Sequence, residues 1–258
     1  MTAATDALLD VRSVTMRFGG LTAVKSLEMQ VPTGALFGLI GPNGAGKTTV
    51  FNVLTGVYTP TEGDVRFEGQ TISGRRPFQI SARGVARTFQ NIRLFADMTV
   101  LENVMTAMHL RSHQVLVDAV LGTARHHREE RESRERALHL LEVVGLARVA
   151  EEQATSLPYG SQRRLEIARA LATDPKLLLL DEPAAGMNPQ ESLELMRLVR
   201  WLRDERRLTI LLVEHNMKVV MGVCDTVQVI DYGETIAVGS PADIQRNPKV
   251  IEAYLGAD

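Results

Sequence analysis

The sequence has very little cysteine, no long apolar run and no excess of either charge. One cysteine, Cys224, stands among 258 residues, which rules out an internal disulfide and a cysteine-rich zinc site. The longest apolar stretches, such as 177–180 and 210–213, are far shorter than the ~18–20 residues of a membrane-spanning helix. The N-terminus has no basic segment followed by an apolar one, so we expect no signal peptide.

Charge and composition narrow the class of protein further. Lys and Arg number 29 against 31 Asp and Glu, and this near-neutral balance argues against a dedicated nucleic-acid binder. Hydrophobic residues make up 45% and charged residues 23%, which is typical of a globular protein. We therefore expect a protein of the cytosol that can dock on a membrane through a partner.

Strand and helix patterns alternate along the chain and predict an α/β fold with a mostly parallel sheet. Buried strands are predicted at 35–40, 177–180 and 209–213, helices at 47–57, 162–173 and 189–204, and a hairpin around 231–234. Residues 8–32 predict further strands, and 61–90 predict short strands broken by glycines. The segment from about 99 to 154 is helical in pattern and interrupts this alternation.

Within the helical segment, residues 125–136 are almost wholly charged, with the sequence RHHREERESRER. Glu130 and Glu132 precede Arg134 and Arg136 by four residues, the favourable order for ion pairs on a helix. Two interpretations are open: a solvated helix face, which is the more common use of such a pattern, or a contact surface for a partner.

A glycine-rich segment, GPNGAGKT at 41–48, fits the phosphate-binding pattern G-x-x-x-x-G-K-[ST]. It follows a predicted strand and opens a predicted helix, which is the setting the pattern requires. Glycines let successive N–H groups point at anionic oxygens, and the helix N-terminus adds partial positive charge. Lys47 supplies a cation to the β- and γ-phosphates, and the Thr48 hydroxyl can bind Mg²⁺. Asn43 and Thr49 are candidate binding residues by position.

Two carboxylates follow the four leucines of 177–180. Asp181 comes at the carboxyl end of that predicted strand, where ligands bind in open α/β sheets, and can hold Mg²⁺. Glu182 is next and can orient and deprotonate a water for in-line attack on the γ-phosphate. The alternative, an exposed acidic turn, loses most of its weight beside the phosphate-binding pattern.

Further motifs follow in a characteristic order, and over essentially its whole length the chain resembles the ATP-binding subunits of ABC transporters. Gln90, in the sequence TFQ, resembles the Q-loop, and LPYGSQRR at 157–164 resembles the ABC signature. The sequence AAGMN at 184–188 occupies the D-loop position, and His215 that of the switch histidine. Phe18 stands where the family places an aromatic ring under adenine.

The signature departs from the family's usual LSGGQ at Pro158, Tyr159 and Ser161, and Asn188 replaces the usual D-loop aspartate. However, YGSQRRLEIAR from 159, AAGMNP from 184 and NPKVIEAYLG from 247 look like the subgroup that energises branched-chain amino acid uptake. The segment 111–136 resembles the charged insertion in the longer of that subgroup's two ATP-binding subunits. Within that subgroup, the chain therefore resembles the longer subunit.

The resemblance implies a fold, cofactors and site residues. The fold is a P-loop NTPase (RecA-like) core with an N-terminal antiparallel β part, over 1–91 and 162–258, and an inserted helical subdomain, 92–161, that carries the signature. The cofactors are ATP and Mg²⁺. Catalysis is assigned to Lys47, Gln90, Glu182 and His215, and metal binding to Thr48, Gln90 and Asp181. Nucleotide binding is assigned to Phe18, Val24, Gly41, Pro42, Asn43, Gly44, Ala45, Gly46, Lys47, Thr48, Thr49, Tyr159, Gly160, Ser161 and Gln162.

The resemblance also implies partners. Two ATP-binding subunits, alike or different, pair head to tail, so that the signature of one meets the phosphate loop of the other. Transmembrane permease subunits, and indirectly an extracytoplasmic substrate-binding protein, complete the transporter. The expected location is the cytoplasmic face of the cell (inner) membrane, and no nucleic acid is expected.

Alternative readings remain for single residues and for the whole chain. His215 fits a packed residue at a strand end, Gln90 an exposed polar residue with no binding role, and Phe18 a core residue. The cargo can instead be urea, short amides or an exported lipid. A soluble ABC ATPase of DNA repair or translation needs a long coiled coil or two ATPase units, for which 258 residues leave no room. A small-molecule P-loop kinase does not need Gln90, His215 and a signature-like loop together.

Overall fold

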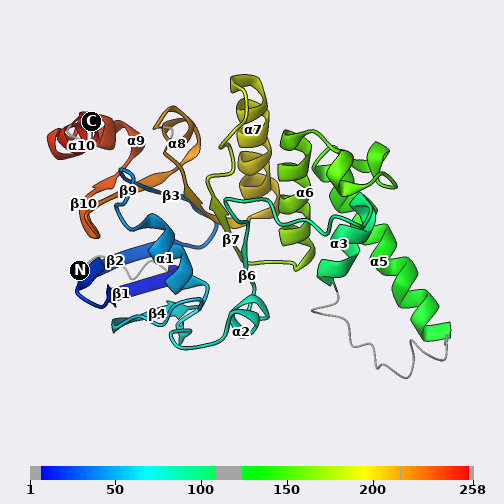
Figure 1. Cartoon of the computed structure of the whole chain (residues 1–258), viewed down its shortest axis with the longest axis horizontal. Coiled ribbons are helices and arrows are strands. Elements are labelled where there is room, and N and C mark those ends of the chain that lie inside the picture. Colours follow the sequence, from blue (N-terminus) through cyan, green and yellow to red (C-terminus); the bar gives the residue numbers. More distant parts are fainter. Residues whose placement is uncertain (1–6, 109–123, 216, 256–258) are drawn as a thin grey trace. The chain divides into compact units, whose positions relative to one another are not determined.

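The computed structural model describes residues 7–108, 124–215 and 217–255. They fall into two compact units (Figure 1). Unit 1 is Met1–Arg87 with Lys176–Asp258, and unit 2 is Thr88–Pro175. Among the described residues, no helix combines the length and the hydropathy needed to cross a bilayer.

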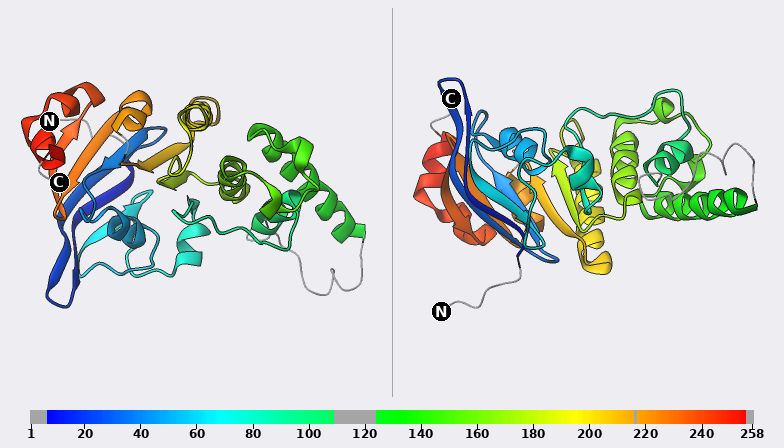
Figure 2. Two further views of the ribbon diagram at one scale, coloured as in Figure 1. Left: turned by 45° about the horizontal axis from the view of Figure 1, so that its top comes forward. Right: turned by 90° about the horizontal axis from the view of Figure 1, so that it is seen from below.

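Unit 1 contains two sheets (Figure 2). The antiparallel sheet has the order β2-β1-β4-β5 and the larger sheet the order β10-β9-β3-β8-β7-β6. The antiparallel sheet consists of β1 (Ala7–Phe18), β2 (Leu21–Pro32), β4 (Glu62–Phe67) and β5 (Gln70–Thr71). The larger one consists of β3 (Leu36–Ile40), β6 (Val85–Arg87), β7 (Leu177–Asp181), β8 (Thr209–Val213), β9 (Thr226–Asp231) and β10 (Glu234–Gly239).

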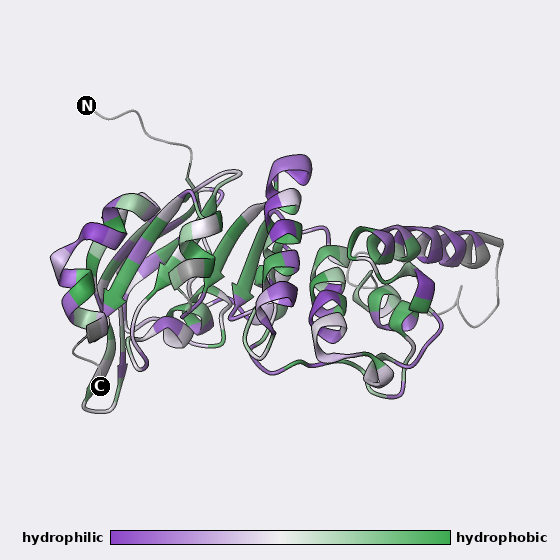
Figure 3. Cartoon of the chain, turned by 90° about the horizontal axis from the view of Figure 1, so that it is seen from above, coloured by the Kyte–Doolittle hydropathy of each residue, from purple (hydrophilic) through white to green (hydrophobic). Residues whose placement is uncertain are grey.

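The larger sheet is parallel except for β10, which forms the predicted hairpin with β9. Every residue of β3, β7 and β8 is buried, as expected for strands covered on both faces. Figure 3 shows the strands of this unit mostly in green, the colour of hydrophobic residues. One hydrophobic cluster joins Leu9 and Val31 of the antiparallel sheet, Leu39 and Leu179 of the parallel sheet, and Phe51. The carboxyl ends of β3, β7 and β8 are therefore held by a continuous core, and they carry the candidate site residues.

The helices of unit 1 are α1 (Lys47–Leu54), α2 (Pro77–Ser81), α7 (Pro189–Arg206), α8 (Met217–Val223), α9 (Pro241–Arg246) and α10 (Pro248–Leu255). Helix α2 was not expected, because the glycines of 61–90 indicated only strands and turns. It begins at a proline, and the Gln79 side chain accepts a hydrogen bond from the Arg76 N–H. Helix α7 begins at Pro189, with the Asn188 side chain accepting hydrogen bonds from Gln190 and Glu191 N–H at 2.9 Å each.

Unit 2 is helical, with α3 (Val100–Met108), α5 (Ala124–Val143) and α6 (Tyr159–Ala172) in mutual contact. Two 3₁₀ turns, Ala147–Val149 and Ala154–Ser156, connect α5 to α6. Because α6 packs on α3 and α5, residues 162–175 belong to unit 2, which differs from the subdomain limits of 92 and 161 expected from the sequence. The limits 92 and 161 for the helical subdomain that carries the signature stay a prediction.

The charged part of α5 carries mostly exposed side chains over 128–136. There the Arg134 guanidinium pairs with Glu151 at 2.6 Å, and both side chains are more than half exposed. Apolar contacts begin further along the helix, where Ala137 and Leu141 are buried. Of the charged insertion 111–136, residues 111–123 lie outside the described residues.

Candidate functional site

The phosphate loop lies between β3 and α1, as the sequence predicts. Two of its glycines have no room for a side chain. A Cβ on Gly41 would lie 2.1 Å from the Ile230 carbonyl oxygen, and one on Gly46 would lie 2.5 Å from that of Ala23. Gly46 also has a φ of 103°, a left-handed value that lets the chain turn into α1. The loop's path therefore requires glycine at both positions.

Lys47 is buried inside this loop. Its ammonium donates hydrogen bonds to the carbonyl oxygens of Gly41 at 2.6 Å and Pro42 at 2.8 Å. Burial lowers the pKa of Lys47, and the charges of Glu182 and Asp181 oppose that shift. The cation thus bonds to the loop backbone and interacts electrostatically with the carboxylates of Asp181 and Glu182 at the end of β7.

The outer part of the loop is accessible. Asn43, Gly44 and Thr48 are exposed, whereas Ala45 is buried and Thr49 half-buried. The first N–H groups of α1 have no partner within the helix and make its N-terminus an anion site. A short exposed hydroxyl, a buried lysine and a glycine backbone fit a polyphosphate and its cation.

The C-terminal helix α10 reaches this loop, which the sequence did not indicate. Lys249 and Glu252 of this helix line a pocket together with Pro42 and Asn43 of the loop. Burial raises the pKa of Tyr254, on the same helix, to about 12. The Gly233 N–H, in the turn between β9 and β10, also donates to the Ala45 carbonyl at 3.0 Å. The last segment of the chain therefore supports the phosphate loop from outside.

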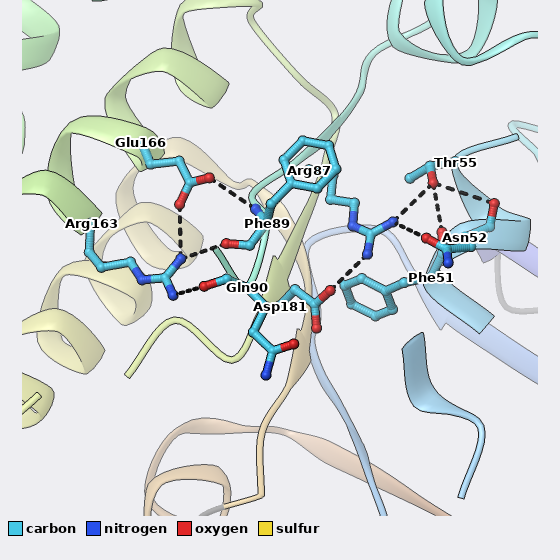
Figure 4. A network of polar contacts seen from close by, with 9 residues as sticks. All are labelled: Phe51, Asn52, Thr55, Arg87, Phe89, Gln90, Arg163, Glu166 and Asp181. Carbon is cyan, nitrogen blue, oxygen red and sulfur yellow. Dashed lines mark hydrogen bonds and ion pairs between the residues drawn. The ribbon is translucent and has the colours of Figure 1, made fainter. Parts of the chain in front are cut away.

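Asp181 ends β7 and is buried, as predicted. It forms an ion pair with Arg87 at 2.8 Å, in which both side chains are less than a tenth exposed (Figure 4). Arg87 also donates to the Asn52 side chain at 2.7 Å and lies 5.4 Å from the centre of the Phe51 ring. These contacts fix the carboxylate at the strand end, where an oxygen ligand suits Mg²⁺. The sequence analysis missed Arg87, because its partners lie far away along the chain.

Glu182 and His215 come together at the ends of β7 and β8. The His215 Nδ1 atom lies 3.6 Å from a Glu182 carboxylate oxygen. Glu182 has a φ of 47°, which non-glycine residues rarely adopt, and its N–H donates to the Val213 carbonyl at 2.9 Å. Its side chain is 17% exposed and that of His215 is 56% exposed. A strained, nearly buried carboxylate beside an accessible imidazole is an arrangement suited to proton transfer.

Glu214 is a second residue that the sequence analysis missed. It is 1% exposed, and its carboxylate accepts a hydrogen bond from the Ala184 N–H at 2.9 Å. This contact ties the residue before His215 to the segment 184–188. In that segment Asn188 caps α7, so an asparagine at this position has a structural reason of its own.

Phe18 and Val24 lie on the antiparallel sheet. Phe18 ends β1 as an exposed residue, 41% accessible, and its ring centre lies 5.1 Å from that of Tyr58 in an edge-on arrangement. Val24 is 1% exposed, and its side chain would lie 3.5 Å from a Cβ on Gly46. The core position considered for Phe18 is thus not supported, while its contact with adenine stays a prediction.

We expect Phe18→Ala to weaken ATP binding by about 1–3 kcal/mol, the range for stacking of an aromatic ring on a base. Because the ring is accessible, the temperature of thermal unfolding should change little. Isothermal titration calorimetry and a thermal melt of the same preparation separate the two effects. Unchanged ATP affinity would remove Phe18 from the binding site.

In unit 2, the signature loop differs from its expected form. Helix α6 begins at Tyr159 rather than near Gln162, and the N–H groups of Ser161 and Gln162 already donate to the Pro158 carbonyl at 2.9 and 3.0 Å. The Gln162 side chain bonds back to the Leu157 carbonyl at 2.9 Å. The first backbone N–H groups of α6, those of Tyr159 and Gly160, are therefore the ones left without a partner inside the helix. Gln90, exposed in the same unit, also keeps its assigned role as a prediction.

Gly160→Asp should leave ATP binding by the isolated chain intact but abolish ATP-driven dimerisation and hydrolysis. The added carboxylate would stand beside the N–H groups that open α6 and repel phosphate. Native mass spectrometry with ATP, together with an ATPase assay, measures both effects, and a thermal melt excludes unfolding of the buried position. Normal dimers and turnover would show that this loop does not act on a partner's nucleotide.

The sequence is similar to two protein-family models and to individual transport proteins. The family model described as ABC transporter matches residues 24–185, and a second, described as branched-chain amino acid ATP-binding cassette transporter, matches residues 234–258. The chain is 49% identical to the high-affinity branched-chain amino acid transport ATP-binding proteins BraF of Pseudomonas aeruginosa and LivG of Escherichia coli. Each alignment covers 96% of this chain and 98% of the relative.

The fold is likewise that of known cassettes. The ADP conformation of MJ1267, an ATP-binding cassette of an ABC transporter, superposes with a TM-score of 0.84 at 30% identity, covering 97% of this chain and 99% of that one. The chain that matches these proteins also contains the phosphate loop between β3 and α1 and the neighbouring side chains of Glu182 and His215. The protein therefore belongs to the ABC transporter family, as an ATP-binding subunit and ATPase.

Proposed function

We propose that this chain hydrolyses ATP to energise an importer of branched-chain amino acids. The observation that carries the cargo is the likeness to BraF and LivG over nearly the full chain, including the C-terminal segment 234–258. Part of that segment, α10, lines a pocket together with the phosphate loop residues Pro42 and Asn43. The likeness thus includes the surroundings of the nucleotide site.

The side chains act on ATP in distinct ways. The loop amides and Lys47 bind the phosphate oxygens, and the Phe18 ring stacks on adenine. Glu182 accepts the proton of the attacking water, and His215 contacts the γ-phosphate and steadies the Glu182 carboxylate. Mg²⁺, when bound, neutralises charge on the phosphates, and we assign Thr48, Asp181 and Gln90 to hold it.

The working form is a head-to-tail dimer of ATP-binding subunits on permease subunits at the cytoplasmic face of the membrane. In it, residues 159–162 of one subunit meet the phosphate loop of the other. Closing around ATP and reopening after hydrolysis drive the permease between its two orientations. The second subunit can be a copy of this chain or a shorter relative, and a binding protein outside the membrane delivers the cargo.

Transport by a reconstituted complex tests the proposal. This chain is purified with its permease subunits and second ATPase subunit, placed in vesicles, and supplied with ATP and a binding protein loaded with leucine, isoleucine or valine in turn. Leucine, isoleucine and valine should accumulate, and a complex carrying Lys47→Ala should not transport them. Stimulation by urea, short amides or a lipid in place of these amino acids would overturn the cargo assignment.

A further inference from the structure

A buried ion pair lies on α6, directly after the signature loop. Arg163 and Glu166 are one turn apart at 3.0 Å, with side chains 2% and 6% exposed (Figure 4). Burial raises the pKa of Glu166, and the Phe89 N–H and Arg163 oppose the shift. Charges removed from water in this way cost free energy unless hydrogen bonds satisfy each of them.

Those partners are backbone groups of the Q-loop, in the same unit. A Glu166 carboxylate oxygen accepts the Phe89 N–H at 3.0 Å. The Arg163 guanidinium donates to the Phe89 carbonyl at 2.5 Å and, through its other nitrogen, to the Gln90 carbonyl. One charged pair therefore bonds three backbone groups of the Q-loop: the Phe89 N–H, the Phe89 carbonyl and the Gln90 carbonyl (Figure 4).

The same arginine also contacts the signature loop. Its guanidinium donates to the Tyr159 hydroxyl at 3.1 Å and lies 5.5 Å from the centre of that ring. A second arginine, Arg169, holds the loop further along, donating to the Arg93 carbonyl and lying 4.7 Å from the centre of the Phe95 ring. The Q-loop main chain is thus attached to α6 at two places.

We propose that Arg163 and Glu166 are positioning residues that lock the Q-loop main chain to the signature helix, so that Gln90 and the signature loop move as one piece. This inference rests on the proposed function, which assigns both loops to the ATPase cycle. A planar guanidinium can bridge two carbonyls at once, whereas the ammonium of a lysine acts as a single point charge. The lock therefore depends on arginine and not on positive charge alone.

Arg163→Lys is the sharpest variant, because it keeps a cation beside Glu166 and so leaves no unpaired buried charge. We expect unchanged ATP affinity in the full-length chain, because the phosphate loop belongs to unit 1. ATPase turnover of the assembled transporter should fall about tenfold at an unchanged KM for ATP, which corresponds to the loss of one charge-assisted hydrogen bond. Amide hydrogen exchange of residues 89–93 should become faster, measured by mass spectrometry with and without ATP.

A double variant covers the case in which Arg163→Lys folds poorly. Arg163→Met with Glu166→Gln removes both charges together, which buried pairs tolerate better than the loss of one partner. It should also keep ATP affinity and lose turnover. The matched control is Arg164→Lys, the same substitution at the next residue of α6, whose guanidinium bonds within the same helix, to the Ser161 hydroxyl at 3.2 Å. It should resemble the wild type.

Wild-type turnover together with wild-type exchange at 89–93 in Arg163→Lys would overturn the lock. Equal losses in Arg163→Lys and Arg164→Lys would also overturn it, because the effect would then belong to α6 as a whole. Absence of ATPase activity in the wild-type transporter is a different result and counts against the proposed function. In that case the exchange of residues 89–93 still decides whether the pair holds the loop.

Discussion

Glu182→Gln is expected to bind ATP and Mg²⁺ normally but to hydrolyse ATP about 10²–10⁴-fold more slowly, the range for loss of a general base. The amide has nearly the shape of the carboxylate but cannot accept the proton of the attacking water. Because Glu182 lies at the end of β7, beside His215 and outside the phosphate loop, its replacement leaves the loop contacts unchanged. ATP should therefore persist in a stable dimer.

Single-turnover hydrolysis and size-exclusion chromatography with ATP measure the two parts of this result. Glu194→Gln is the matched control, because the same chemical change then falls on an exposed residue of α7. Wild-type turnover in Glu182→Gln would show that another group takes the proton. A monomer that binds ATP but never dimerises would instead indicate damage to the interface.

Lys47→Ala is expected to weaken ATP binding by about 3 kcal/mol or more, over 100-fold, as when one partner of a buried charge pair is removed. The variant loses the cation that faces the phosphates. It also leaves Asp181 and Glu182, the carboxylates that interact with this lysine, without its charge, so that an incoming polyphosphate meets net negative charge. Turnover should be lost with binding.

Fluorescent-nucleotide titration measures the affinity, and a thermal melt shows whether the loop still folds without the two hydrogen bonds from Lys47. Lys25→Ala provides the control, since Lys25 is an exposed lysine of the same unit, paired with Glu234 at the surface. Near-normal ATP affinity in Lys47→Ala, with a native melting profile, would contradict the phosphate-loop assignment.

Sequence analysis predicted those parts of the site that depend on neighbouring residues. The glycine-rich loop, the leucine strand ending in Asp181 and the C-terminal hairpin are local patterns, and each is confirmed as an element of the fold. The start of α6 was misplaced, because Gly160 and Ser161 are weak helix formers, whereas the structure starts the helix directly after Pro158.

What sequence analysis missed are contacts between distant segments. Arg87 and Asp181 are 94 residues apart, and Glu166 and Phe89 are 77 residues apart. Neither pair produces a pattern in the sequence. Arginine and glutamate are usually exposed, so the sequence alone does not predict that Arg87 and Glu166 are buried. The sequence did not single out the buried Glu214 either, because only its neighbour His215 matches a motif of the family.

The place where unit 2 leaves and rejoins unit 1 has a consequence for how the chain tolerates change. The insertion departs after β6 and returns at β7, and these strands are parallel neighbours, with Arg87 opposite Leu179. The two ends of the insertion, Thr88 and Pro175, are therefore held near each other by the pairing of β6 with β7. Since closing a loop costs only about 0.6 kcal/mol more for each doubling of its length, the length of the insertion between these strands can change at small entropic cost. Helical content can thus diversify here while the nucleotide chemistry stays constant.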